Sequence, residues 1–143
     1  MREILLITLT LIGINSFGQE SNCSDFKNGT FYVSISEPIQ INWKIVREGN
    51  AQTEIVTELP KELIDSGYPT GHQYGIINWI DDCTYRLTYD ESKSELSESQ
   101  KLINSLGGVL TELIKIKENC FYYKSTLIYE GGEQILNEKL CKE

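Results

Sequence analysis

The chain has 143 residues, of which 40% are hydrophobic and 24% charged, and its formal net charge is -8. This length suits a single domain, and the apolar fraction excludes a disordered chain. The mean hydropathy of -0.28 excludes a polytopic membrane protein. Because an acidic chain lacks the basic surface that displaces counterions from nucleic acid, we expect no nucleic-acid partner.

The N-terminus has the pattern of a secretory signal peptide. A short charged start precedes an apolar run over residues 4–14, and the small residues Ser16 and Gly18 stand where a signal peptidase reads the chain. The run is shorter than the about 20 apolar residues of a membrane anchor. We predict that residues 1–18 are removed on export, and that residues 19–143 form one secreted or periplasmic domain with no membrane anchor.

All four cysteines lie in the predicted mature domain, and exported chains meet oxidising conditions in which cysteines form disulfides. Zinc is the alternative explanation. However, the chain has no CxxC pair and one histidine, so the spacing of a zinc ligand set is absent. We therefore expect two disulfides, no metal site and no other cofactor. The cysteines are Cys23, Cys83, Cys120 and Cys141.

Apolar residues alternate with polar ones at period two over eight segments, as β-strands require. Turn residues stand between these segments. The pattern predicts a mainly β protein, a single antiparallel meander of about eight strands that forms a barrel or half-barrel of the lipocalin-like kind. The predicted strands are residues 30–36, 39–47, 51–59, 75–80, 83–89, 109–116, 120–129 and 133–141.

Two short helices are predicted between the strands. Residues 60–66 begin with a proline and stop at Gly67. Residues 97–106 open with Ser97 and Gln100 at the spacing of a capping box and end at a glycine pair. Helices of this size more often cover a sheet or the mouth of a barrel than carry chemistry.

The register of the hairpin formed by the second and third strands depends on its turn. A three-residue loop pairs Arg47 with Ala51 and gathers the apolar side chains of both strands on one face. A two-residue turn pairs Arg47 with Gln52 and brings Gln52 and Glu54 to that face instead. A slip of one residue reverses every side chain. Segregation of apolar residues favours the three-residue loop.

The hairpin of the fourth and fifth strands is predicted by the same argument. A three-residue loop at residues 80–82 pairs Trp79 with Cys83 and Ile77 with Tyr85. This register keeps the apolar side chains of the two strands together, and we expect it.

The last hairpin predicts how the cysteines pair. A turn centred on the glycines at 131–132 puts Cys141 opposite Tyr122, with Cys120 one diagonal step away. A shift of one residue in that centre puts Cys120 directly opposite Cys141, within bridging distance. We therefore predict two disulfides, Cys120–Cys141 and, from the remaining cysteines, Cys23–Cys83.

Three spaced motifs occur within residues 23–89: Cys23-x-x-Phe26-x-x-Gly29-x-Phe31, Arg47-x-x-x-x-Gln52-x-Glu54 and Trp79-x-x-Asp82-Cys83-x-Tyr85-x-Leu87. They resemble a group of short, uncharacterised exported proteins of Gram-negative bacteria, some of which carry the label DNA topoisomerase IV. A topoisomerase needs a tyrosine nucleophile in a large basic DNA gate, whereas this chain is small and acidic. The resemblance implies a small exported β protein and no particular activity.

The trio Arg47, Gln52 and Glu54 is the strongest candidate for a binding site. One hairpin register points all three into the barrel, where a few convergent polar groups can orient a ligand. The competing interpretation is a solvated edge, with Lys44 opposite Glu54 as a surface ion pair. Aromatic residues at period-two spacing either line a cleft or fill the core. The candidate ligand-binding residues are Arg47, Gln52, Glu54, Trp43, Trp79 and Tyr85.

No activated nucleophile, metal set or acid pair stands out, and His72 lies in a turn-rich segment without a nucleophile beside it. We expect no catalytic residues. The leading hypothesis is a non-catalytic domain that binds a small ligand or a protein partner. The alternative is an acidic inhibitory or structural protein that docks on a basic partner, and a hydrolase ranks third. An interior cavity of about 300 Å3 or more favours the first class, whereas a filled core with a large exposed patch favours the second.

Overall fold

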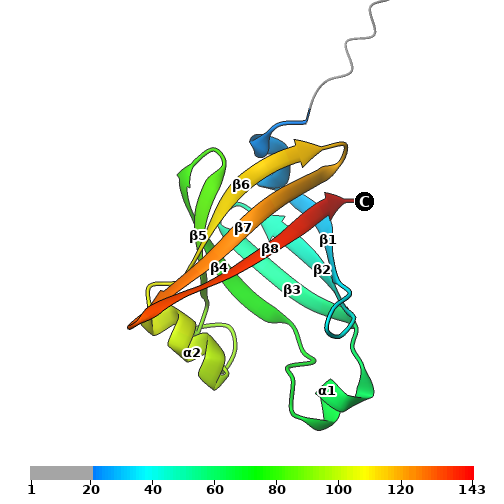
Figure 1. The fold of residues 1–143 in the computed structure, drawn as a ribbon, viewed down its shortest axis with the longest axis vertical. Helices are drawn as coiled ribbons and strands as arrows, with labels where there is room; N and C mark the ends of the chain where they lie inside the picture. Colours follow the sequence, from blue (N-terminus) through cyan, green and yellow to red (C-terminus); the bar gives the residue numbers. More distant parts are fainter. Residues whose placement is uncertain (1–20) are drawn as a thin grey trace, which may run out of the picture.

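A computed structural model describes residues 21–143, so the predicted signal peptide over residues 1–18 lies outside the described part. Eight antiparallel strands form one closed barrel, which confirms the expected fold class (Figure 1). The strands are β1 (Gly29–Ile35), β2 (Ile41–Glu48), β3 (Ala51–Glu58), β4 (Gln73–Asp81), β5 (Thr84–Tyr89), β6 (Val109–Lys117), β7 (Cys120–Tyr129) and β8 (Gly132–Lys142).

Each strand pairs with its neighbour in the sequence, and β8 closes the barrel against β1. The pairings differ in extent. The strands β7 and β8 pair from Tyr129–Gly132 to Cys120–Cys141 without interruption. By contrast, β1 meets β8 in two residue pairs, Phe31–Lys142 and Tyr32–Cys141. The closure of the barrel is therefore its shortest strand pairing.

One end of the barrel is filled by the 3-10 helix η1 (Cys23–Phe26), an element that was not predicted from the sequence. The Asn22 side chain accepts a hydrogen bond from the Ser24 backbone N–H at 2.9 Å and so caps this helix. Phe26 is fully buried, and its ring centroid lies 5.7 Å from that of Phe31 and 5.3 Å from that of Phe121. The hydrophobic core is thus concentrated at the η1 end.

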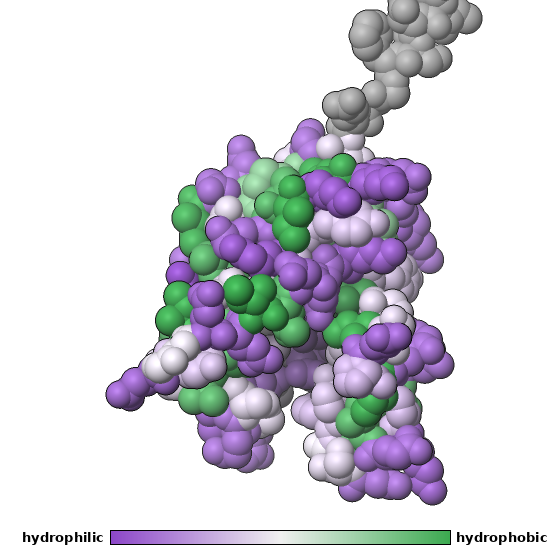
Figure 2. Space-filling view, in the orientation of Figure 1, coloured by the Kyte–Doolittle hydropathy of each residue, from purple (hydrophilic) through white to green (hydrophobic). Residues whose placement is uncertain are grey.

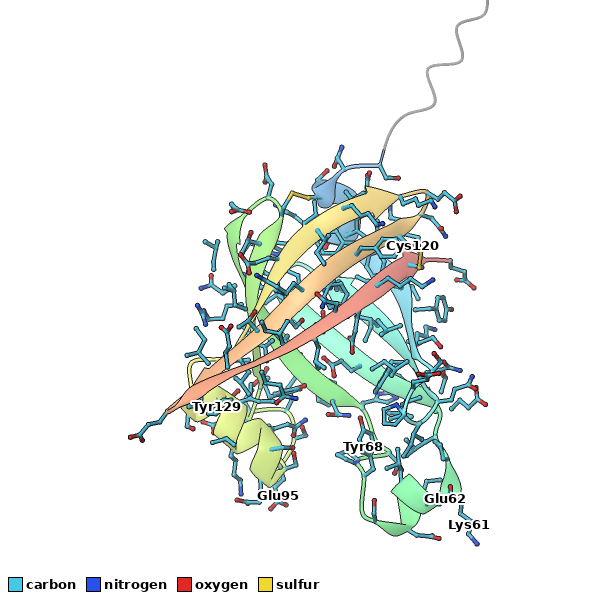
Figure 3. All side chains as sticks on the ribbon, viewed as in Figure 1. Lys61, Glu62, Tyr68, Glu95, Cys120 and Tyr129 are labelled. Atoms are coloured by element: carbon cyan, nitrogen blue, oxygen red, sulfur yellow. A yellow bond between two sulfur atoms is a disulfide. The ribbon has the colours of Figure 1, made fainter. Side chains whose placement is uncertain are left out.

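Both predicted disulfides, Cys23–Cys83 and Cys120–Cys141, are present. The first joins η1 to the β4–β5 turn. The second forms because the β7–β8 turn is centred on Glu130 and Gly131, one residue before the glycine pair, which brings the two cysteines directly opposite each other. Figure 3 places Cys120 at the η1 end of the barrel. Two disulfides are compatible with an exported, oxidising location.

The two predicted helices are present as α1 (Lys61–Asp65) and α2 (Glu98–Ser105), both at the end of the barrel away from η1 (Figure 1). The capping box of α2 forms as predicted, because Ser97 and Gln100 exchange side-chain to backbone hydrogen bonds. The Gln100 side chain also donates a 2.7 Å hydrogen bond to Gln73, which ties α2 to the start of β4. No helix of the described residues is long and apolar enough to cross a membrane.

The predicted three-residue loop between β2 and β3 is wrong. Arg47 pairs with Gln52 and Glu48 pairs with Ala51, so the turn consists of Gly49 and Asn50 alone. Gly49 has a φ of +61°, which matches a two-residue turn with glycine in first position. The inward face of β3 is therefore polar near this turn.

The expected register of β4 and β5 is also wrong. Trp79 pairs with Tyr85 rather than with Cys83, because the turn consists of Asp82 and Cys83, with Asp81 opposite Thr84, and the ladder then shifts by one residue between Asp81 and Trp79. The turn is stabilised locally, since the Asp81 carboxylate accepts a 2.8 Å hydrogen bond from the backbone N–H of Cys83. The irregularity keeps Trp79 and Tyr85 on the same face.

Candidate functional site

An open cavity of about 1210 Å3 extends from the middle of the barrel to the end where α1 and α2 lie. In the space-filling view, the molecule is hollowed at this end, between the lobes that carry the two helices (Figure 2). Leu63 of α1 and Tyr68 line the mouth, and Figure 3 shows Tyr68 beside α1. Arg47, which contacts η1, lies at the floor.

Apolar side chains form most of the cavity wall, because alternate residues of every strand point inward. They come from strands on all sides of the barrel, so a ligand inside would be surrounded by apolar surface. These wall residues include Val33, Ile35, Trp43, Ile45, Leu87, Val109 and Leu140.

Arg47 is the best-connected polar residue of the barrel and is 4% exposed. Its Nε donates to Gln52 Oε1 at 2.8 Å, its Nη1 to the Phe26 carbonyl at 2.9 Å, and its Nη2 to the Tyr85 hydroxyl at 2.6 Å. One guanidinium thereby joins β2 to β3, η1 and β5.

Aromatic rings enclose the same guanidinium. The Arg47 Cζ lies 4.8 Å from the ring centroid of Tyr85, 5.7 Å from that of Phe31 and 5.9 Å from that of Trp79. Such contacts stabilise a cation that has been taken out of water. Because its Nε, Nη1 and Nη2 are each bonded to protein groups, Arg47 serves chiefly to hold the closed end together.

Gln52 passes the polar network on toward the cavity. This side chain is 5% exposed, accepts from Arg47, and donates from Nε2 to Glu54 Oε1 at 2.9 Å. Burial raises the pKa of the Glu54 carboxyl, and the charge of Glu138 adds to the rise, while the Gln52 hydrogen bond and the charge of Arg47 oppose it. The part of Glu54 that remains accessible faces the cavity that it lines.

A second carboxylate, Glu138 of β8, faces the same cavity. Its Oε2 accepts a 2.9 Å hydrogen bond from the Tyr123 hydroxyl. Burial raises the pKa of this phenol well above its ordinary value, and the charge of Glu138 raises it further. Glu138 is not among the binding residues predicted from the sequence, although the register set by Cys120 and Cys141 pairs it with Tyr123.

Two further tyrosines line the cavity toward its mouth. Burial raises the pKa of both Tyr68 and Tyr89, and the charge of Glu54 is the next cause for each. Both phenols therefore stay protonated and neutral at physiological pH, and present rings and hydroxyls to the interior.

Five of the six predicted ligand-binding residues line the cavity: Arg47, Gln52, Glu54, Trp43 and Tyr85. The sixth, Trp79, lies outside the lining. Its ring packs edge-on against Tyr85 at 4.9 Å and lies 4.9 Å from the Lys27 ammonium. The competing pair of Lys44 with Glu54 does not form, because the observed register puts Lys44 opposite Ile55.

Over residues 21–143, no cluster of three or more histidine, cysteine, aspartate or glutamate residues is arranged to hold a metal ion. His72 is exposed, and its ring lies 6.4 Å from that of Tyr74. The site thus consists of a large apolar cavity with a few carboxylates, amides and phenols at fixed positions. Compared with protein-family models, curated proteins and solved structures, the chain matches none of them.

Proposed function

We propose that this protein is an exported, non-catalytic β-barrel that binds a small apolar or amphipathic molecule in its interior. The observation that carries the proposal is the cavity of about 1210 Å3. Small-molecule sites are typically concave, apolar spaces of about 300–1,000 Å3 with a few fixed polar groups. A core that served only stability would be filled by side chains, since protein interiors pack as densely as organic crystals.

Export rests on two observations. The first 18 residues have the pattern of a signal peptide, and the two disulfides suit an oxidising compartment. We propose a secreted or periplasmic location. N-terminal sequencing of the exported protein should begin at Gln19, and a mature protein that retains Met1 would overturn this part of the proposal.

Several of the residues that carry the resemblance to short exported bacterial proteins come together at the closed end of the barrel, whereas Glu54 and Leu87 of the same motifs line the cavity. Cys23 is bonded to Cys83, and Arg47 joins the Phe26 carbonyl to Tyr85. We propose that these motifs help to close the barrel and that the members of that group share this fold. The ligand bound inside the barrel would then differ from member to member.

Binding can be tested with the neutral fluorescent probe N-phenyl-1-naphthylamine, whose emission rises when it enters an apolar space. We expect saturable binding to the purified protein. Val109→Trp places a large ring in the cavity and should reduce the affinity at least tenfold. Leu110→Trp is the matched control, because this neighbouring residue lies outside the cavity lining, and it should bind as the native protein does. Lack of saturable binding by the native protein would overturn the proposal.

A further inference from the structure

The charges inside the barrel do not balance. Arg47 is the one cation of the described residues that reaches the floor, and Glu54 and Glu138 are the two carboxylates that the strands direct into the space above it. A third carboxylate, Glu37, borders the cavity from the exposed loop between β1 and β2. Lys115 and Lys139 border the same space but flank the Tyr122 ring, at 5.0 Å and 5.9 Å from its centroid.

Strand alternation places these two lysines outside. Tyr123 and Glu138 point inward, so their sequence neighbours Tyr122 and Lys139 point outward. Lys115 pairs with Tyr122 and lies on the same side. The interior therefore holds two carboxylates and one guanidinium.

The guanidinium and the carboxylates also differ in how many of their nitrogen or oxygen atoms already form hydrogen bonds with protein groups. Arg47 uses Nε, Nη1 and Nη2 in hydrogen bonds to protein groups. Each carboxylate uses one oxygen, Glu54 Oε1 toward Gln52 and Glu138 Oε2 toward Tyr123.

The other oxygen of each carboxylate, Glu54 Oε2 and Glu138 Oε1, has no hydrogen-bond partner within residues 21–143. No fully buried side-chain oxygen or nitrogen of those residues lacks a partner, so these two oxygens are open to the cavity. They are acceptors placed in an apolar space, where a donor with positive charge is bound most strongly.

Aromatic rings stand beside the two carboxylates. Tyr123 is bonded to Glu138, while Tyr68 and Tyr89 line the cavity with Glu54. The face of a phenol ring attracts a cation. A phenol that stays protonated is also uncharged, so it does not change the net charge that the carboxylates give to the cavity. The remaining wall is apolar and suits a hydrocarbon or aromatic body.

Building on the proposed function, we propose that the ligand is an organic amine, which binds as an ammonium ion between the Glu54 and Glu138 carboxylates with its apolar body along the barrel wall. The ammonium donates to the two open carboxylate oxygens. A fatty acid or another anion would meet carboxylates in the cavity and a guanidinium of which each nitrogen already donates one hydrogen bond to a protein group.

Three probes with one alkyl body separate this inference from the proposed function: decylammonium, decanol and decanoate, titrated by calorimetry at about pH 7 below their micelle concentrations. Decanol reports whether the cavity binds an apolar body. We expect decylammonium to bind about tenfold more tightly than decanol, in line with hydrogen bonds to charged groups, and decanoate to bind most weakly.

Matched variants identify the anchors. Glu54→Gln and Glu138→Gln keep the side-chain shape, and each should weaken decylammonium about tenfold while decanol affinity stays the same, which also shows that the barrel is intact. Glu133→Gln is the control, because Glu133 is an exposed residue of the same strand as Glu138, and it should change nothing.

The order of the three probe affinities tests the amine proposal even without the variants. Equal binding of the three probes would overturn the amine and leave the binding barrel standing. Tightest binding of decanoate would overturn it in favour of Arg47 as an anion anchor. Binding of none of the three would overturn both proposals.

Discussion

Among single side chains, Arg47 is exceptional because it bonds three other elements while almost fully buried. Replacement by methionine keeps much of its volume but leaves the Phe26 carbonyl and the Tyr85 hydroxyl without its donors. Stranding buried polar groups in this way costs about 3 kcal/mol. We expect Arg47→Met to lower the free energy of unfolding by that amount in urea titrations.

Lys44→Met on the same strand is the control for this measurement, because no hydrogen bond or ion pair involves the Lys44 side chain in residues 21–143. It should change the free energy of unfolding by no more than about 0.5 kcal/mol. A loss below about 1 kcal/mol in Arg47→Met would show that the closed end does not depend on the guanidinium.

Glu54 makes stability depend on pH. Burial raises its pKa from the ordinary 4.5, with Glu138 adding to the rise, while Gln52 and Arg47 oppose it. The folded state therefore binds this proton more tightly than the unfolded state does. The resulting stabilisation is complete below about pH 4.5 and is lost as pH rises through the folded-state pKa.

Glu54→Gln cannot titrate, so the difference in unfolding free energy between native protein and variant should move with pH. The native protein should lose stability relative to Glu54→Gln as pH rises from about 4.5, measured by urea unfolding at a series of pH values. The neighbouring Tyr68 and Tyr89 stay neutral over this range. Glu133→Gln should show a constant offset. A constant offset for Glu54→Gln as well would contradict the raised pKa.

At the scale of elements, the two-residue turn between β2 and β3 decides which side chains enter the cavity. Gly49 has a φ of +61°, which L residues with a side chain adopt at a cost of about 1–2 kcal/mol. We expect Gly49→Ala to lower the free energy of unfolding by this amount. Gly71→Ala is the control, since a Cβ there meets no atom within 4 Å and its φ needs no glycine. Equal effects of the two changes, measured in urea, would be evidence against the strained turn.

The elements themselves were predictable from the sequence, and the register was not. Alternation located all eight strands, and proline, capping and glycine signals located α1 and α2. The error lay in assuming that inward residues are apolar. Since β3 faces a cavity rather than a filled core, Gln52 and Glu54 point inward, and the turn residue Gly49 was the better guide to the pairing.

The candidate site shows the same division. Arg47, Gln52 and Glu54 attracted notice because they are spaced within one hairpin. Glu138 escaped because its role depends on a partner in another strand, Tyr123, and on the cavity between them. Which residues pair across strands depends on the closed barrel, and the sequence of a single segment does not predict it.

At the scale of the whole molecule, the barrel has a rigid end and a hollow end. The disulfides Cys23–Cys83 and Cys120–Cys141 close chain separations of 60 and 21 residues. On the chain-entropy account they stabilise the fold by roughly 4 and 3 kcal/mol. Together with Phe26 and its aromatic neighbours, the disulfides stabilise the η1 end. Because this end supplies the stability, the opposite end of the barrel does not need a filled core.

The short pairing of β1 with β8 has a kinetic consequence. Phe31–Lys142 and Tyr32–Cys141 are the two residue pairs that join the first strand to the last. A seam of this length should come apart far more often than the continuous β7–β8 ladder, by local opening without global unfolding. In hydrogen exchange followed by NMR, the seam amides should lose protection before those of β7, and equal protection factors would argue against it. Val33 of β1 and Glu138 of β8 line the cavity, and their two strands meet at the seam. Opening of the seam would therefore offer a bound molecule a lateral exit, and the lifetime of the complex would follow the rate at which the seam opens.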